Sequence, residues 1–320
     1  MADVIDLSRP TTRVPLLASV MAVGAGLVWS LGALMARVAD QTDAWQYLIW
    51  RSIGIVVVME VLAFVRRQPP SLPVAFRSGR RMHLACAALL LASVAFVYAV
   101  KNTTAANAAF LASVTPLIAV VLARVFLRER LTGVTIGALG LALVGLLVMV
   151  VADLGAGNMA GNIAAVMSSV GFAVYAICVR SDPDRNWSPV LPGYAVMMIA
   201  LCAAVTVVNG NPLVPPLKDT LCALFHGGVL IVVGTLLFNA ATRSVPAVAM
   251  TIFAQSETVF VPVWIFLWFS ERPAPAALLG GAIILSAVVG KAIIDSRPGT
   301  RSGPAAHQGQ VPEPGPGSIA

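Results

Sequence analysis

Long apolar segments follow one another along almost the whole chain, and a helix of ~20 apolar residues spans the ~30 Å hydrocarbon core of a bilayer. The chain is 58% hydrophobic and only 11% charged, whereas a soluble domain is ~25% charged. A transmembrane β-barrel is excluded because its strands are short segments of alternating polarity. The sequence therefore predicts an all-α polytopic membrane protein with ten transmembrane helices, at residues 15–37, 44–65, 82–100, 104–126, 131–151, 160–180, 189–209, 218–240, 246–269 and 275–294.

The basic residues are distributed unevenly between the connections. A net charge of +7 would suit a nucleic-acid partner in a soluble protein, but most of the 21 Lys and Arg residues lie between the apolar segments. Basic connections stay on the cytoplasmic side of a membrane. With both termini cytoplasmic, the outer connections hold only Arg37, Lys101, Lys218 and Arg272. We therefore expect a multi-pass protein of the cytoplasmic (inner) membrane, with the lipid bilayer and no nucleic acid as a partner.

Both chain ends are expected in the cytoplasm. Residues 1–14 form the predicted N-terminal segment, and residues 296–320 are rich in Pro and Gly with almost no large apolar residues. Such a composition buries too little apolar surface to offset the entropy of ordering. We expect the C-terminal tail to be disordered.

Motifs for cofactors and catalysis are absent from the sequence. The connections contain no G-x-x-x-x-G-K-[ST], and no H-E-x-x-H or Cys/His cluster occurs. The cysteines, Cys86, Cys178, Cys202 and Cys222, all lie in apolar segments without metal-binding spacing. We expect no metal, no cofactor and no enzymatic activity.

An internal repeat relates the two halves of the chain. Residues 96–130 align without gaps with residues 238–272, which places Lys101 on Arg243 and Glu129 on Glu271. The alignment predicts one repeat at residues 15–151 and a second at 152–295, each with five spans. Because five is odd, the second repeat is inverted in the membrane relative to the first. Inverted repeats are a transporter architecture whose binding site lies near the bilayer midplane.

Two stretches of this repeat carry a family resemblance. AVKNTTAANAAFLASVTPLIAVVLARVFLRERLT and FNAATRSVPAVAMTIFAQSETVFVPVWIFLWFSER resemble the signature of the EamA-type transporters of the drug/metabolite transporter (DMT) superfamily. The resemblance covers residues 15 to 294 and implies two inverted five-helix repeats. It also implies export of amino acids or other small metabolites. This chain departs from the family by placing Thr258 after Glu257 and delaying proline to Pro262.

Glu257 is the leading candidate for a functional residue because it lies near the middle of the ninth span. A charge at the bilayer centre costs ~2.5–3.5 kcal/mol on insertion scales, and intramembrane ionisable groups are commonly functional. We expect Glu257 to contact a substrate amine or to couple transport to protons. The alternative is a fixed ion pair or interhelix hydrogen bond, with Arg51 as the candidate partner. The neighbouring Gln255 and Ser256 point to other faces of the helix, so at most two of these three share a cavity.

Aromatic and amide residues in other spans are candidates for the lining of a substrate site. An aromatic wall with a few amides suits an amphiphilic metabolite. The alternative is that the aromatic residues belong to interface belts and that the amides join helices. The predicted substrate-binding residues are Trp29, Tyr98, Asn107, Tyr175, Asn239, Gln255 and Glu257. We expect His226, in the eighth span, to hydrogen-bond to a neighbouring helix rather than to relay protons.

A third group of residues is predicted to serve in gating or in structure. Arg51 cannot lose its proton and needs a carboxylate, carbonyls or an anionic substrate. Lys101 and Arg243 are interfacial bases or gate contacts, and Glu129 and Glu271 favour the N-terminus of the following helix. Prolines inside helices remove a backbone hydrogen bond, so Pro116 and Pro262 are expected to kink their helices, either as hinges or as fixed curvature.

Three functional hypotheses follow from these patterns. The leading one is a secondary active exporter of a small metabolite, such as an amino acid or an amphiphilic analogue, that works by alternating access. The proton gradient or the substrate gradient would supply its energy. The second is uptake or exchange of an anionic metabolite, with Arg51, Lys101 and Arg243 as anion contacts. The third, from a different class, is a non-transporting membrane scaffold or sensor. The sequence leaves open whether the protein is a monomer or a homodimer.

Overall fold

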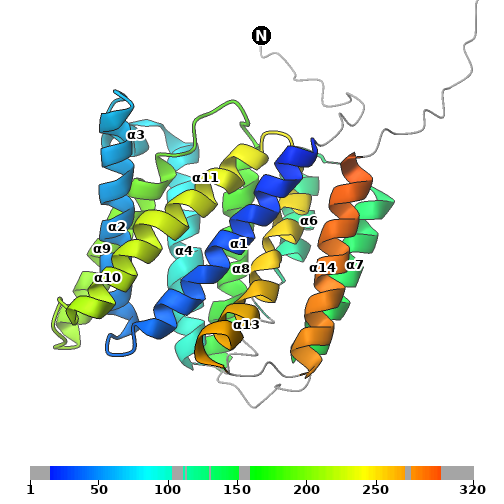
Figure 1. Ribbon diagram of the computed structural model, residues 1–320. Coiled ribbons are helices and arrows are strands. Elements are labelled where there is room, and N and C mark those ends of the chain that lie inside the picture. Colours follow the sequence, from blue (N-terminus) through cyan, green and yellow to red (C-terminus); the bar gives the residue numbers. More distant parts are fainter. Residues whose placement is uncertain are drawn as a thin grey trace, which may run out of the picture.

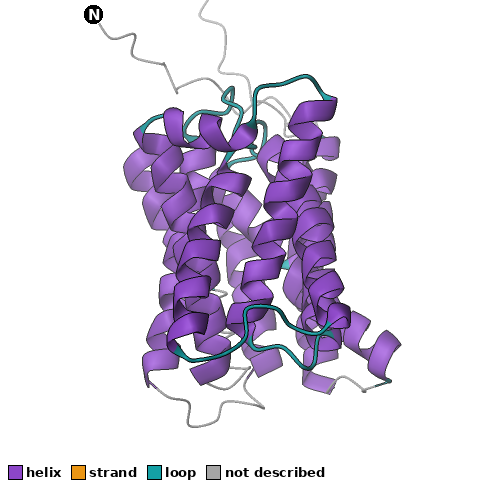
Figure 2. Ribbon diagram, turned by 90° about the vertical axis from the view of Figure 1, so that its left-hand side faces the viewer, coloured by secondary structure: helices purple, strands orange, loops and turns teal. Residues whose placement is uncertain are grey.

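The computed structural model describes residues 15–102, 111, 114–129, 131–150, 159–270 and 275–296, and within them all regular secondary structure is helical (Figure 2). The helices are α1 (Leu16–Val38), α2 (Ala44–Val65), α3 (Ser71–Arg77), α4 (Arg80–Asn102), α6 (Thr115–Leu122), the π-helical η1 (Ala123–Leu127), α7 (Gly133–Val150), α8 (Met159–Arg180), α9 (Val190–Val208), α10 (Leu217–Phe225), the π-helical η3 (His226–Ile231), α11 (Val232–Ala241), α12 (Ala247–Ala254), α13 (Ser256–Phe269) and α14 (Pro275–Ser296).

Eight helical stretches of the described chain are long and apolar enough to cross a membrane. They occupy the positions predicted for spans one to three and six to ten. Two shorter apolar helices, Thr115–Leu127 and Gly133–Val148, occupy the positions predicted for spans four and five. The prediction of an all-helical, membrane-spanning protein is therefore confirmed. Several predicted segments lie outside the described residues: 1–14, 103–110, 112–113, 151–158, and the tail after Ser296.

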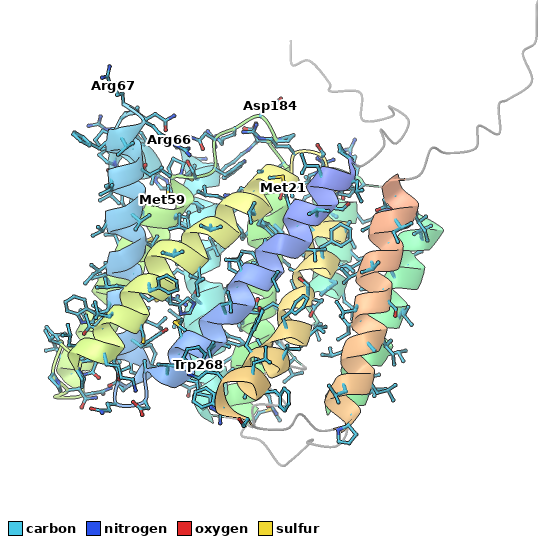
Figure 3. All side chains as sticks on the ribbon, in the orientation of Figure 1. Met21, Met59, Arg66, Arg67, Asp184 and Trp268 are labelled. Carbon is cyan, nitrogen blue, oxygen red and sulfur yellow. The ribbon has the colours of Figure 1, made fainter. Side chains whose placement is uncertain are left out.

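The chain runs back and forth between two ends of the molecule (Figure 1). α1 begins and α14 ends at the same end, where Arg66, Arg67 and Asp184 also lie, whereas Trp268 lies near the opposite end (Figure 3). We call these the basic end and the Trp268 end. At the basic end the connection predicted between spans two and three contains the short helix α3. Its first N–H groups, at Ser71 and Leu72, donate to the Glu60 carboxylate at 3.2 and 2.7 Å, which satisfies donors that a helix start leaves free.

The most extensive helix pairs are α4 with α8, α7 with α14 and α2 with α9. The eighth span, from α10 to α11, packs on both α1 and α2. In Figure 1, α2 and α9 lie at one side of the molecule and α7 and α14 at the other. Small residues allow the close approaches. A Cβ at Gly171 would lie 2.7 Å from Ala88 O, and one at Gly145 would lie 2.7 Å from Gly280 O. Because lipid tails are as apolar as the side chains, such packing stabilises helix pairs in a membrane.

At the Trp268 end, the connection between α1 and α2 is tied to the first turn of α10 and to the connection that precedes it. The Gln41 N–H donates to Asp219 at 2.9 Å, and the Asn211 amide donates to Asp43 at 2.7 Å. The Lys218 ammonium donates to Asp40 at 3.1 Å, and this hydrogen bond lowers the pKa of the exposed Asp40 carboxyl. These contacts join the first and second halves of the chain at the ends of the apolar helices.

The ninth span is interrupted. α12 ends at Ala254, Gln255 makes a turn, and α13 begins at Ser256. The sequence predicts a kink at Pro262 of this span, but Pro262 lies inside α13 and the interruption precedes it. Pro116 lies in the first turn of α6, where its missing N–H removes no intrahelical hydrogen bond. The interruption of the ninth span therefore lies at Gln255 and not at Pro262, and Pro116 begins a helix instead of lying inside one.

Candidate functional site

The break in the ninth span is held against α1. The Ser256 hydroxyl donates to Val23 O at 3.1 Å, and the Trp264 indole N–H donates to Ser30 Oγ at 2.8 Å. A Cβ at Gly26 would collide with Ser256 Oγ and would lie 3.1 Å from the backbone nitrogen of Glu257. Both ends of the contact are fixed by hydrogen bonds between the first and second halves of the chain. The position of Glu257 beside Gly26 of α1 is therefore well defined.

Glu257 lies in the first turn of α13 and is half-buried. It forms no hydrogen bond or ion pair with any described residue, so the alternative pairing with Arg51 is not present there. The N-terminus of a helix carries a partial positive charge, which favours a carboxylate in the first turn. The structure thus places an acidic side chain at the start of a helix inside a transmembrane span. No described residue donates a hydrogen bond to the Glu257 carboxylate.

An aromatic cluster, consisting of Trp29, Phe172, Tyr175 and Phe238, lies one turn further along α1. The Trp29 ring centroid is 5.9 Å from that of Phe172 and 5.6 Å from that of Phe238, and Tyr175 stacks on Phe238 at 5.8 Å. These separations fall within the ~4.5–7 Å of favourable aromatic pairs. A Cβ at Gly234 would collide with the indole of Trp29, so a glycine is needed there. Side chains of α1, α8 and α11 thus form one aromatic cluster, in which Tyr175 and Phe238 are fully buried.

Two of the predicted lining residues meet at this cluster. The Tyr175 hydroxyl donates to Asn239 Oδ1, while Asn239 Nδ2 is buried without a partner among the described residues. Tyr175 is fully buried. Trp29, Tyr175 and Asn239 are all predicted lining residues, and the structure places all three in or beside the aromatic cluster. The sequence analysis does not single out Phe238, although Phe238 directly precedes Asn239 and aligns with Phe96 in the internal repeat.

Removal of the Tyr175 hydroxyl tests whether this hydrogen bond holds the cluster. Tyr175→Phe is expected to lower the free energy of unfolding by ~1–3 kcal/mol, because a buried acceptor, Asn239 Oδ1, loses its donor. The decrease should appear as a lower midpoint when the purified protein is heated in detergent. An unchanged midpoint would show that the hydrogen bond contributes nothing to stability.

Two other predicted lining residues, Tyr98 and Gln255, lie in spans that do not contribute to the aromatic cluster. Tyr98 is near the end of α4 and 39% exposed, and Asn107 lies outside the described residues. Gln255, at the break in the ninth span, accepts a hydrogen bond from the Thr258 hydroxyl at 3.4 Å. Gln255 also lines a small apolar pocket with Pro116, Leu139, Ala142, Leu143 and Leu146.

The residues predicted for gating have separate roles. Glu129 forms an ion pair with Arg180 at 3.0 Å, and Arg180 also donates at 3.1 Å to the carbonyls of Thr242 and Arg243. This network at the basic end links both halves of the chain, and the sequence did not single out Arg180. Arg243 is exposed in its turn. Lys101 lies in the last turn of α4 with its side chain outside the description, and Glu271 lies outside the described residues.

The expectation for His226 is confirmed. His226 begins η3, and its Nδ1 is 2.9 Å from the Tyr47 hydroxyl of α2. Its ring packs so closely on α1 that a Cβ at Gly32 would collide with it. The imidazole thus joins the eighth span to the first two.

Comparison with known proteins identifies the fold and the family. The model of the EamA-like transporter family matches residues 16–151 and 159–291. The chain belongs to the EamA-like transporter family. A probable terminal-alkyne amino-acid exporter from Streptantibioticus cattleyicolor is 26% identical over 198 residues, which cover 59% of this chain and 64% of that protein. A solved crystal structure has a TM-score of 0.74 at 17% identity and covers 88% of this EamA-like chain and 99% of its own.

The family match confirms the resemblance stated from the two signature stretches. Together with the apolar helices, it makes this EamA-like protein a multi-pass membrane protein of a transporter family. The similarity to the crystal structure concerns the fold alone.

Proposed function

We propose that this EamA-like protein is a secondary active transporter that exports an amino acid or a similar amphiphilic metabolite. The observation that carries the proposal is Glu257, an acidic side chain that no described residue pairs, at the start of α13. It lies beside Gly26 of α1, one turn from Trp29 and the aromatic cluster. A carboxylate near the half-buried rings of Trp29 and Phe172 suits a substrate with an amine and an apolar side chain.

Alternating access is the mechanism that we propose, and the helix pairs support it. α1 packs on α11 and α13, while α8 packs on α4 and α6. In the internal repeat, α1 corresponds to α8, α11 to α4 and α13 to α6. Exchanging the two halves therefore converts the contacts of α1 into those of α8, and it maps the pairs α2–α9 and α7–α14 onto themselves. This relation supports two inverted repeats, residues 15–151 and 152–295, that rock around a site between them. The energy source would be the proton gradient or the substrate gradient.

The basic end is the proposed cytoplasmic side of the cytoplasmic membrane. Arg66 and Arg67 lie there (Figure 3), as does the Glu129–Arg180 network. Basic connections favour this orientation. The amino-acid exporter among the relatives supports both the outward direction and the substrate class.

A growth-tolerance screen tests the proposal. Cells that make the protein and cells that carry an empty vector would be grown with toxic amino acids and analogues, including L-propargylglycine. We expect the protein to raise the tolerated concentration of at least one compound that has an amine and an apolar side chain. Greater sensitivity would indicate uptake. Unchanged tolerance to every compound, with the protein present in the membrane, would favour a non-transporting scaffold.

A further inference from the structure

Arg51 lies in α2 where the eighth span crosses it most closely. A Cβ at Gly227 of η3 would collide with the Arg51 carbonyl, and one at Gly54 would lie 2.5 Å from Leu224 O. The Arg51 backbone is therefore fixed against η3. Its Nε and Nη2 atoms are buried, so this part of the guanidinium does not reach the outer surface of the helix bundle.

The guanidinium lacks an acceptor. Neither Nε nor Nη2 has a hydrogen-bond partner among the described residues, and Arg51 forms no ion pair there. These two donors lie on the same edge of the planar group. That edge matches a carboxylate, which accepts two parallel hydrogen bonds from it. Because arginine stays charged in proteins, the unsatisfied edge calls for an anionic acceptor.

The groups around Arg51 do not supply that acceptor. Tyr47, Tyr194 and His226 are close enough for electrostatic interaction with it, but the Tyr47 hydroxyl is already hydrogen-bonded to His226. The Asp219 carboxylate, which also interacts electrostatically with Tyr47, accepts from the Gln41 N–H through Oδ2 and leaves Oδ1 buried without a partner. It forms no ion pair with Arg51 in the described chain.

α1 connects Arg51 with the proposed amine site. Gly26 packs on the start of α13 beside Glu257, and Trp29 belongs to the aromatic cluster. Gly32 packs on His226, and the next residue, Gly227, packs on the Arg51 backbone. Gly26 and Gly32 are six residues apart, which is ~9 Å along a helix. Glu257, the aromatic cluster and the residues beside Arg51 therefore all pack against α1.

From this arrangement we infer that Arg51 binds the carboxylate of the transported substrate. The inference rests on the proposed function and deepens it: the substrate class is a free amino acid, which carries both charges, rather than an amine or an organic cation. The Nε–Nη2 edge of Arg51, which no described residue satisfies, takes the carboxylate.

Thermal stabilisation of the purified protein in detergent tests the inference. The probes are L-phenylalanine, L-leucine and L-propargylglycine, each beside its amide, which keeps the amine and neutralises the carboxylate. For the wild type, we expect the concentration that gives half-maximal thermal stabilisation to be at least ~10-fold lower for an amino acid than for its amide. A lost pair of charged hydrogen bonds predicts a difference of this size. In Arg51→Gln the amide and the amino acid should stabilise the protein at about the same concentration. Arg51→Lys lacks the two-donor edge, so its preference for the amino acid should lie between those of the wild type and Arg51→Gln.

Asp219→Asn is the matched control. If Arg51 serves only as a structural partner of Asp219, Asp219→Asn will abolish the preference as Arg51→Gln does, and the inference is overturned. A wild-type protein that is stabilised equally by acids and amides also overturns it, and this result needs no variant to fold. Transport of both the amino acids and their amides would leave the proposed function intact. If none of the amino acids stabilises the protein, the proposed substrate class and the role of Arg51 are both contradicted.

Discussion

Glu257→Gln is expected to reduce the initial rate of amino-acid transport into proteoliposomes by ~10- to 100-fold, the range that a lost charge-assisted hydrogen bond predicts. Glutamine has nearly the same size as glutamate but no charge to attract an ammonium group. Glu257 has no partner among the described residues, so the substitution breaks no hydrogen bond or ion pair seen in the structure. The stability of the protein should therefore change little while transport falls.

Asp184→Asn is a suitable control for this experiment. Asp184 is an exposed carboxylate at the basic end (Figure 3), and its neutralisation should leave transport at the wild-type rate. The same reconstituted samples can be assayed with and without a pH gradient. A Glu257→Gln variant that transports at the wild-type rate with the same response to the gradient would remove this carboxyl from both substrate binding and proton coupling.

Gly227→Ala is expected to have the largest effect on stability. The added methyl group would collide with the backbone carbonyl of Arg51, and a backbone atom cannot move aside as the end of a flexible side chain can. Overpacking of this kind costs ~1–3 kcal/mol or more. We therefore expect a clearly lower unfolding midpoint in detergent and a smaller yield of folded protein, because α2 must separate from the eighth span.

Gly290→Ala provides the matched comparison. Gly290 also lies in a transmembrane helix, but a Cβ there meets no atom within 4 Å. Alanine in a helix interior is favoured over glycine by ~0.5–1 kcal/mol, so this variant should unfold at the wild-type temperature or slightly above it. If Gly227→Ala were as stable as Gly290→Ala, the close crossing of α2 and η3 would be wrong.

Hydropathy was sufficient to predict most of the spans, because segment length is dictated by the thickness of the bilayer. It could not predict the break at Gln255, since neither glycine nor proline marks that position and the break is stabilised by distant partners. The Ser256 hydroxyl bonds to Val23, and Trp264 bonds to Ser30 of the same helix α1. Contacts between residues so far apart depend on how helices pack, which periodicity does not specify.

In the candidate site, too, some residues were predictable from the sequence and others depend on how the helices pack. Trp29, Tyr175 and Asn239 stood out in the sequence because aromatic and amide side chains are conspicuous in apolar spans. The structure hydrogen-bonds Tyr175 to Asn239 and joins Trp29 to them through Phe238. The partner of Glu129 was not predictable in this way. Arg180 reads as an ordinary basic residue at a helix end, and only the packing of α8 beside the end of α11 places it between Glu129 and the carbonyl of Thr242.

Counterflow in proteoliposomes decides whether this protein carries amino acids. Vesicles would be loaded with an unlabelled amino acid, L-phenylalanine, L-leucine or L-propargylglycine, and diluted into a trace of the same compound carrying a label. Vesicles with the wild-type protein should accumulate the label of at least one compound transiently above its external concentration, and Glu257→Gln vesicles should not. Label that never exceeds the level of protein-free vesicles, for every compound tested, would contradict the assignment of an amino-acid substrate.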